Sequence, residues 1–379
     1  MHDSKHYARE KFWLGLASGG FNLLLLVLLL VTGFSIAIAR WCPGSTWQLV
    51  LEYTVVVWAG FQLLDLPAAW LERRIETRYG MNRQGFASWL WDELKSALIG
   101  GALTVGAAEL IYWWLLPSLP HYWWLCAWAI FTVATVGLMI LGPIVFLPMF
   151  FKLRQMSEDN PADAALVRRL QSTHAALRAQ NPGLPRLHGI FEWKLGEKTA
   201  KANAALIGLG KTRRVIISDT LLADSPVEEI EAVFLHELGH NVHQDLWRGL
   251  AFQTALSLLG FWIAEVALVA LASQLGLHGI ADVAGAPLLL LVFTVLSLLL
   301  LPVRNGFVRA MERRADDYSF ATLGSSAPLL AGLRRLASKN LAEVEPPRWK
   351  EWLLYSHPSI STRIRRGEAW QSSKDAVAS

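Results

Sequence analysis

The residues best suited to catalysis form one short run, His236-Glu237-Leu238-Gly239-His240. Residues four apart share a face of a helix, so the two imidazoles can bind one zinc ion. Glu237 then lies beside the open coordination position, where it can take a proton from a water molecule at the metal. The pattern therefore predicts the catalytic helix of a zinc peptidase.

An ordinary helix with two surface histidines is the alternative interpretation of this run. The residues just before it, Ala232 to Leu235, are apolar, and so is Leu238 inside it, which argues against an exposed helix. A buried helix with two histidines and a glutamate would be costly without a metal or polar partners. We therefore expect a zinc site, with a third protein ligand and one position left for water.

Candidates for the third ligand lie both near the run and far from it. His243 is too close to the helix to bend back onto the ion, and Asp245 would serve only if the helix ended sharply. Farther along the chain, Glu312 and Asp316 are four residues apart on a predicted helix, so Glu312 can bind zinc while Asp316 orients a ligand histidine. A charged helix end, with its acids paired to neighbouring arginines, would explain the same segment.

Apolar segments long enough to cross a membrane surround these residues. The chain is 53% hydrophobic and 17% charged, whereas a soluble domain is about 25% charged. A span needs about 20 mostly apolar residues, and the first segment is too long for a signal-peptide core. The six predicted spans are 12–39, 47–71, 97–116, 122–151, 250–275 and 286–303.

Basic residues lie on one side of these predicted spans, and the opposite loops hold only Arg40. The positive-inside rule then puts both termini and the zinc helix in the cytoplasm. We divide the chain into a four-span membrane bundle (1–152), a cytoplasmic α+β segment with the zinc helix (153–246), a transmembrane hairpin (247–304) and a C-terminal catalytic segment (305–379). The sequence has no nucleic-acid motif, so no nucleic-acid partner is expected.

The predicted cytoplasmic segment alternates helix and strand signals. Asn160-Pro161 begins a helix that ends before Asn181, and Ser225 to Glu228 forms a capping box in front of the zinc helix. Apolar, β-branched runs predict strands at 187–193, 202–209 and 214–218. A strand beside the zinc helix would let a substrate backbone pair with its exposed edge.

Further motifs occur in a fixed order around the zinc helix. They are the segment Glu76 to Lys95; Asn203-Ala204 with the run 210–222; Asn305, Arg309 and Glu312, followed by Asp316; and Ser356-His357-Pro358 with Arg363. Together with the zinc helix, these motifs resemble those of the type I CAAX prenyl protease family of integral-membrane zinc metallopeptidases. The resemblance covers about residues 50 to 370.

The resemblance implies a role for each matching residue. His236, His240 and Glu312 would bind one Zn²⁺ per chain, Glu237 would be the general base, and Asp316 would support a ligand histidine. His357 would donate a hydrogen bond to the oxyanion, although a surface histidine before a proline remains an alternative. The positions implied at the substrate are Asn203, Ala204, Asn305, Arg309 and Arg363, where the arginines would either hold the site together or meet a substrate carboxylate.

The fold expected from these features is a mainly α-helical polytopic membrane protein, with about six transmembrane helices and a small α+β gluzincin-type peptidase domain. Its partners would be the bilayer and a peptide or protein substrate, which in this family carries a prenylated C-terminal tail. Six predicted spans, against seven in eukaryotic members, suggest a compact protein of a bacterial inner membrane. A quality-control peptidase and a non-catalytic zinc-binding scaffold remain the alternatives. Two acids inside predicted spans, Glu109 and Glu265, would line a polar cavity or pair with a neighbouring span.

Overall fold

The computed structural model describes residues 2–184, 186–208 and 212–378, and it is mainly helical. Within these residues, five helices are long and apolar enough to cross a membrane, and a bent pair of helices supplies a sixth candidate span. The two members of the pair, Val283–Leu299 and Leu301–Leu323, meet at an angle of 52°. The predicted polytopic architecture is confirmed.

Some candidate spans are single α-helices, and others are interrupted by a π-helical turn or a bend. They comprise α1 (His2–Val31), α3 (Thr46–Arg78), α4 (Phe86–Ala108) continued by a π-helical turn (Glu109–Leu115) and α5 (Leu116–Ser118), α6 (Trp123–Leu141) continued by a second π-helical turn (Gly142–Phe146) and α7 (Leu147–Phe150), α11 (Asp245–Leu271), and α12 (Ala286–Leu299) with α13 (Leu301–Leu323). The predicted first span was wrong at its end. Gly33 adopts a left-handed conformation with φ of 71°, which stops α1 and leaves α2 (Phe34–Trp41) as a separate helix.

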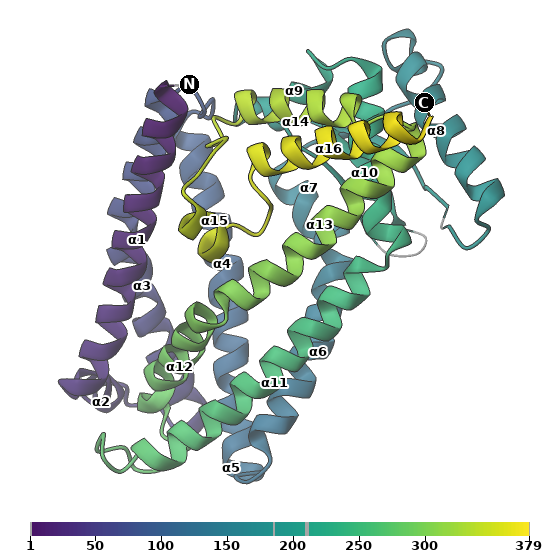
Figure 1. The fold of residues 1–379 in the computed structure, drawn as a ribbon. Helices are drawn as coiled ribbons and strands as arrows, with labels where there is room; N and C mark the ends of the chain where they lie inside the picture. The colour runs from purple at the N-terminus through teal and green to yellow at the C-terminus, as the bar shows by residue number, and fades with distance from the viewer. Residues whose placement is uncertain (1, 185, 209–211, 379) are drawn as a thin grey trace.

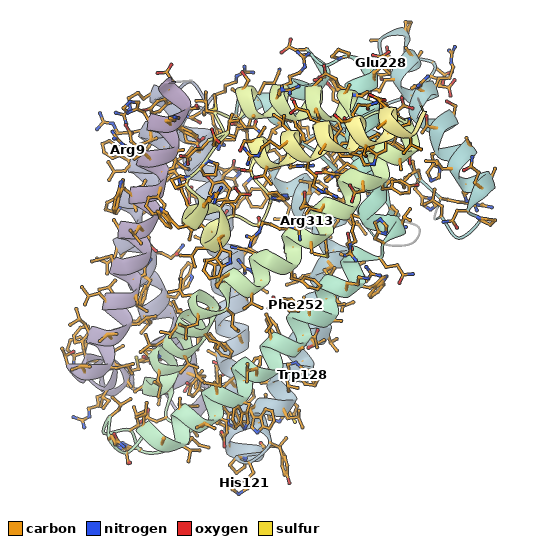
Figure 2. The ribbon with its side chains drawn as sticks, in the orientation of Figure 1. Arg9, His121, Trp128, Glu228, Phe252 and Arg313 are labelled. Atoms are coloured by element: carbon orange, nitrogen blue, oxygen red, sulfur yellow. The ribbon has the colours of Figure 1, made fainter. Side chains whose placement is uncertain are left out.

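Different helices lie at the two ends of the molecule. Figure 1 shows both termini at the same end as α10 (Val227–Val242) and α16 (Ile360–Ala378), whereas α2 and α5 lie at the other end. Among the labelled side chains of Figure 2, Arg9 and Glu228 lie at the first end and His121 at the second. The predicted catalytic helix and the termini therefore share one end of the helix bundle.

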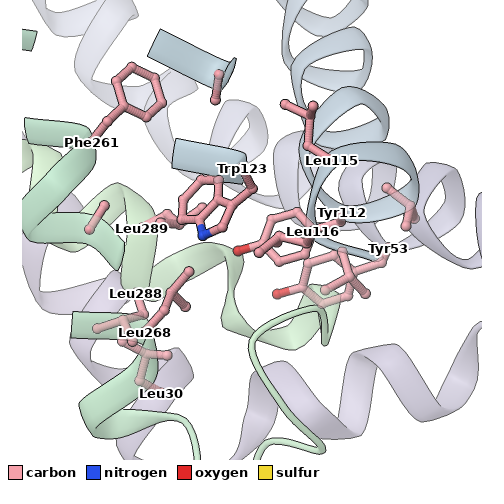
Figure 3. Packing of buried hydrophobic residues seen from close by; sticks show 14 of the residues in the cluster. Leu30, Tyr53, Tyr112, Leu115, Leu116, Trp123, Phe261, Leu268, Leu288 and Leu289 are labelled. Atoms are coloured by element: carbon pink, nitrogen blue, oxygen red, sulfur yellow. The ribbon is translucent and has the colours of Figure 1, made fainter. Parts of the chain in front are cut away.

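Apolar packing holds the other end of the bundle together (Figure 3). Tyr53 and Trp123 are almost fully buried there, and the Tyr53 hydroxyl lies 2.6 Å from that of Ser35. Of the two acids inside the spans, Glu265 accepts a hydrogen bond from the Trp123 indole. Among the described residues, the buried carboxylate oxygens of Glu109 have no hydrogen-bond partner. Glu265 thus follows the alternative of pairing with a neighbouring span.

A small mixed sheet lies between the fourth and fifth spans in the sequence. Its strands are β1 (Leu153–Gln155), β2 (Ile190–Trp193), β3 (Ala204–Ile207) and β4 (Arg214–Ser218), in the order β1-β2-β4-β3. β2 and β4 are parallel, and the other neighbours are antiparallel. Three of the strands were predicted, with Leu209 falling outside the described residues, whereas β1 was not. The order leaves β3 with a free edge.

Helices complete the domain, some packed on the sheet and others on α10, α13 or α14. They are α8 (Pro161–Gln180), α9 (Asp219–Leu222), α10, α14 (Ala327–Lys339), α15 (Arg348–Leu354) and α16. The predicted cap of α8 is confirmed, since the Asn160 side chain accepts a hydrogen bond from the amide of Ala162. The predicted capping box of α10 was wrong. The carbonyl of Pro226 accepts the first helical bonds, so the helix begins one residue later, and the Ser225 hydroxyl has no hydrogen-bond partner in the described part of the chain.

Candidate metal centre

A glycine allows the helix with the His-Glu motif to approach α13 closely. A Cβ atom at Gly239 of α10 would lie 3.0 Å from the Cα of Ala315 on α13, so a larger residue would push the two backbones apart. One turn on, the Ser319 hydroxyl donates to the carbonyl of Ala232, a second contact between these helices. The close packing of α10 and α13 brings together motifs that lie far apart in the sequence.

Two imidazoles and one carboxylate converge where these helices meet. Potential ligand atoms of His236, His240 and Glu312 all lie within 4.8 Å of one another. The Nε2 atom of His236 is 3.5 Å from one oxygen of Glu312, and that of His240 is 3.3 Å from the other. Two histidines and a glutamate, with a position left open, are a donor set of catalytic zinc sites. The three predicted ligands therefore fit a zinc ion.

A further carboxylate faces the other nitrogen of each imidazole. Nδ1 of His236 lies 2.9 Å from Asp316, and Nδ1 of His240 lies 3.0 Å from Asp245. Carboxylates at this position fix the ring orientation and leave Nε2 free to bind a metal. Asp316 was predicted in this role. Asp245 was considered only as a third ligand, and the structure puts it behind His240 instead.

A sharp turn explains how Asp245 reaches His240. α10 ends at Val242, Gln244 adopts a left-handed conformation with φ of 56°, and α11 begins at Asp245. The chain therefore reverses within three residues and returns the carboxylate to the helix that it has just left. The aspartate five residues after the motif is the only sequence signal of this contact.

Arginines neutralise both of these carboxylates. Arg363 is buried and makes a two-pronged contact with Asp316, with Nε 2.9 Å from one oxygen. Arg314 donates to Asp245 at 2.8 Å. Arg363 also places Nη2 3.4 Å from Nδ1 of His236. The arrangement of Arg363 is that of a residue that holds the site together, which was one of its two expected roles.

The acidic groups alter the titration of the imidazoles. Burial lowers the pKa of His236, but the hydrogen bonds to Asp316 and Glu312 outweigh burial and raise that pKa to about 9. The pKa of His240 is also raised, because contacts with Glu312 and Asp245 outweigh burial. The cluster therefore favours positive charge, as a cation site must.

Glu237 stands between the two candidate histidine ligands in the sequence of α10 and reaches the sheet. Its side chain is half-buried, and one carboxylate oxygen lies 3.4 Å from the backbone nitrogen of Leu206 in β3. Asn203 and Ala204 stand at the start of the same strand, and the amide of Ala204 donates to the Asn203 side chain. The predicted base and these two predicted substrate positions thus share one strand edge.

His357 reaches the cluster from the loop between α15 and α16. Its Nδ1 atom lies 2.9 Å from Glu312, and its side chain is 63% exposed. Asn305 and Arg309 lie on α13, before Glu312, and are buried. Their side chains donate to backbone carbonyls of Glu351, Leu353 and Tyr355. The structure therefore puts these two predicted substrate residues against α15.

Comparisons with known proteins cover almost the whole chain. Residues 1–152 match the N-terminal region of CAAX prenyl proteases, described as having five membrane helices, and residues 164–371 match peptidase family M48. Within residues 2–152, the structure has four candidate spans and the short helix α2.

Individual relatives and one solved structure agree with this assignment. An uncharacterized metalloprotease of Bacillus subtilis, YhfN, is 28% identical over 374 residues, which are 96% of this chain and 84% of the relative. A CAAX prenyl protease 1 homolog of Caenorhabditis elegans is 24% identical, covering 97% of this chain and 87% of that protein. The crystal structure of S. mikatae Ste24p has a TM-score of 0.82 at 20% identity, over 97% of this chain and 88% of that one. The chain therefore belongs to peptidase family M48 and is an integral, multi-pass membrane metalloprotease related to CAAX prenyl protease 1.

Proposed function

We propose that the protein is a zinc metalloendopeptidase that cuts peptide bonds near the membrane surface. The observation that carries this proposal is the position of Glu237. It follows His236 directly on α10, and its carboxylate lies 3.4 Å from the amide of Leu206 in the edge strand β3. A carboxylate at this position can act as the general base for a peptide that is bound along that strand.

His236, His240 and Glu312 would hold the zinc ion, with Asp316 and Asp245 orienting the two imidazoles. When bound, zinc polarises the scissile carbonyl and makes a nearby water molecule more acidic. Glu237 accepts the proton of the attacking water and later donates it to the leaving amine. His357 donates to the carbonyl oxygen as negative charge develops there.

The substrate backbone is expected to run along the free edge of β3. An extended peptide there pairs with main-chain groups of the strand, so its scissile bond faces Glu237. Asn203 and Ala204, at the start of the strand, would meet the same peptide on one side of the bond. Backbone pairing gives binding without demanding a particular sequence.

The location of the site supports a membrane-linked substrate in the cytoplasm. The candidate metal centre shares one end of the bundle with both termini (Figure 1), and the positive-inside rule assigns that end to the cytoplasm. Relatives named CAAX prenyl protease 1 support a prenylated C-terminal tail as substrate, whereas the relative from Bacillus subtilis, a metalloprotease, is in keeping with a bacterial member of the family.

A peptide assay in detergent tests this function. The purified, zinc-loaded protein is given a farnesylated C-terminal CAAX peptide and its unprenylated twin, beside the Glu237→Gln variant. Cleavage of only the lipidated peptide would establish a prenyl protease. Equal cleavage of both, lost in the variant, would indicate a general membrane peptidase with a quality-control role. Zinc binding without hydrolysis would leave the non-catalytic scaffold.

A further inference from the structure

His357 owes its position to the backbone around it. It lies in the loop between α15, which ends at Leu354, and α16, which begins at Ile360. Its Nδ1 atom is 2.9 Å from Glu312, although 63% of its side chain is exposed. Packing around an exposed imidazole restrains it little, so the two ends of the loop must fix its place.

Two buried side chains of α13 hold the first end of the loop. Asn305 donates to the carbonyl of Leu353 at 2.9 Å. Nη1 of Arg309 donates to the carbonyls of Glu351 and Tyr355, at 3.1 and 2.5 Å. The Glu351 carbonyl also accepts the amide of Tyr355 at 3.4 Å, whereas carbonyls in the last turn of a helix generally lack helical partners, and a cation there is favourable. Three carbonyls at or just after the end of α15 are thereby bonded from α13.

Glu351 holds the second end of the loop. Its carboxylate accepts a hydrogen bond from the amide of Ser359 at 3.0 Å and another from the hydroxyl of Thr362 at 3.4 Å. Ser359 is buried and immediately precedes α16. The residue whose carbonyl is held by Arg309 thus uses its side chain to hold the far side of His357.

These anchors share a face of α13 with the candidate metal ligand. Asn305, Arg309, Glu312 and Asp316 follow one another at intervals of four, three and four residues, so they form one buried stripe. Asp316 extends the same support to α16 through Arg363. The helix that presents Glu312 therefore also fixes both helices that flank His357.

We propose that Asn305, Arg309 and Glu351 form a latch that positions His357 at the metal centre. We call these three residues the α15 latch. They act through His357 and make no contact with substrate, so Arg309 and Asn305 are positioning residues. This inference rests on the proposed function for its kinetic consequence, but the geometry of the loop can be measured without any activity.

Hydrogen exchange of the full-length protein in detergent tests the latch directly. The variants are Arg309→Gln and Glu351→Ala, with Arg309→Lys to restore the charge. The charge-matched control is Arg304→Gln, because Arg304 is exposed on the same helix. Amides of residues 353–360 should exchange about fivefold faster for each hydrogen bond lost, partly recover in Arg309→Lys, and stay unchanged in the control. Slow exchange of the backbone amides of α10 shows that a variant has folded. If Arg309→Gln does not fold, the result for Glu351→Ala is used in its place. Unchanged exchange of this loop in a folded variant overturns the proposal.

A double-mutant cycle tests whether Arg309 influences turnover through His357. If the latch acts through His357, adding Arg309→Gln to His357→Ala should lower kcat no further, and KM should stay the same. Independent losses, with a raised KM, would make Arg309 a substrate contact and would overturn the latch. If the wild-type protein hydrolyses no peptide, the proposed function fails, and the exchange experiment still decides the latch.

Discussion

His240 and Asp245 face each other across the turn that separates α10 from α11, with Nδ1 of the imidazole 3.0 Å from the carboxylate. The turn depends on the left-handed Gln244 between them. Asp245 is buried and also accepts a hydrogen bond from Arg314. One carboxylate thus links a candidate metal ligand, the start of a candidate membrane span and the helix that carries Glu312.

Replacing Asp245 by Asn should weaken zinc binding. The loss of the carboxylate makes the His240 imidazole a poorer ligand and leaves Arg314 without its charge partner, so we expect about 10- to 100-fold lower zinc affinity. Competition with a chelator of known affinity measures the change. Asp317→Asn is the matched control, because Asp317 is paired with Arg366 away from the cluster. Equal affinity in the wild-type protein and Asp245→Asn would remove Asp245 from the metal centre.

Replacing Glu237 by Gln should abolish turnover and leave zinc bound. The amide keeps the shape of the side chain but cannot accept the proton of the attacking water, and a general base contributes about 10²- to 10⁴-fold to rate. Single-turnover hydrolysis and metal content, measured on the same sample, test both parts. Full activity in this variant would refute the assignment of the base.

The metal-free protein should become less stable as pH rises through about 9. The pKa of His236 is raised to about 9 by Asp316 and Glu312, above the usual value of about 6.5 in an unfolded chain. Its contribution is therefore complete below pH 6.5 and is lost as pH rises through 9. Melting temperatures of the metal-free protein between pH 6 and 10 measure this loss.

Zinc should reverse that trend. The ion must displace protons from both histidines, so zinc affinity should increase over the same pH range. A melting temperature of the metal-free protein that does not change between pH 7 and 10 would contradict the close contact of His236 with the two acids.

Replacing Gly239 by Ala should separate the candidate ligands. The added Cβ would lie 3.0 Å from the Ala315 backbone, and overpacking of this kind costs about 1–3 kcal/mol. Because α10 carries the histidines and α13 carries Glu312, zinc affinity should fall together with the melting temperature. Gly249→Ala is the control, since a Cβ atom there meets nothing within 4 Å. Equal effects of the two substitutions would show that the close approach is unimportant.

The sequence predicted those parts of the fold that local patterns determine. The strand 214–218 and the start of α8 agree with the prediction because β-branched residues and an Asn-Pro cap act locally. His236 and His240 share a face of α10 because a spacing of four residues does so in any helix, whereas Glu312 joins them only through the packing of α13 on α10. The strand, the helix cap and the spacing of the two histidines therefore need no knowledge of the rest of the chain.

The features that were missed depend on distant partners or on single backbone angles. β1 has only three residues and exists because Leu153 pairs with Trp193, 40 positions away in the sequence. The break at Gly33 and the turn at Gln244 each depend on one left-handed residue. Glu351 could not be singled out, since its partners at Ser359 and on α13 come together only in the folded protein.

The metal centre is joined through the chain to two candidate membrane spans, α11 and the bent pair of α12 and α13. Asp245, which contacts His240, is the first residue of α11, and Glu312 lies eleven residues after Leu301, where α13 begins. At 1.5 Å per residue, those eleven residues span about 16 Å. Under the proposed function, a substrate anchored in the same membrane would be cut only where its tether is long enough to reach Glu237, so the length of the tether would help to select the bond that is cut.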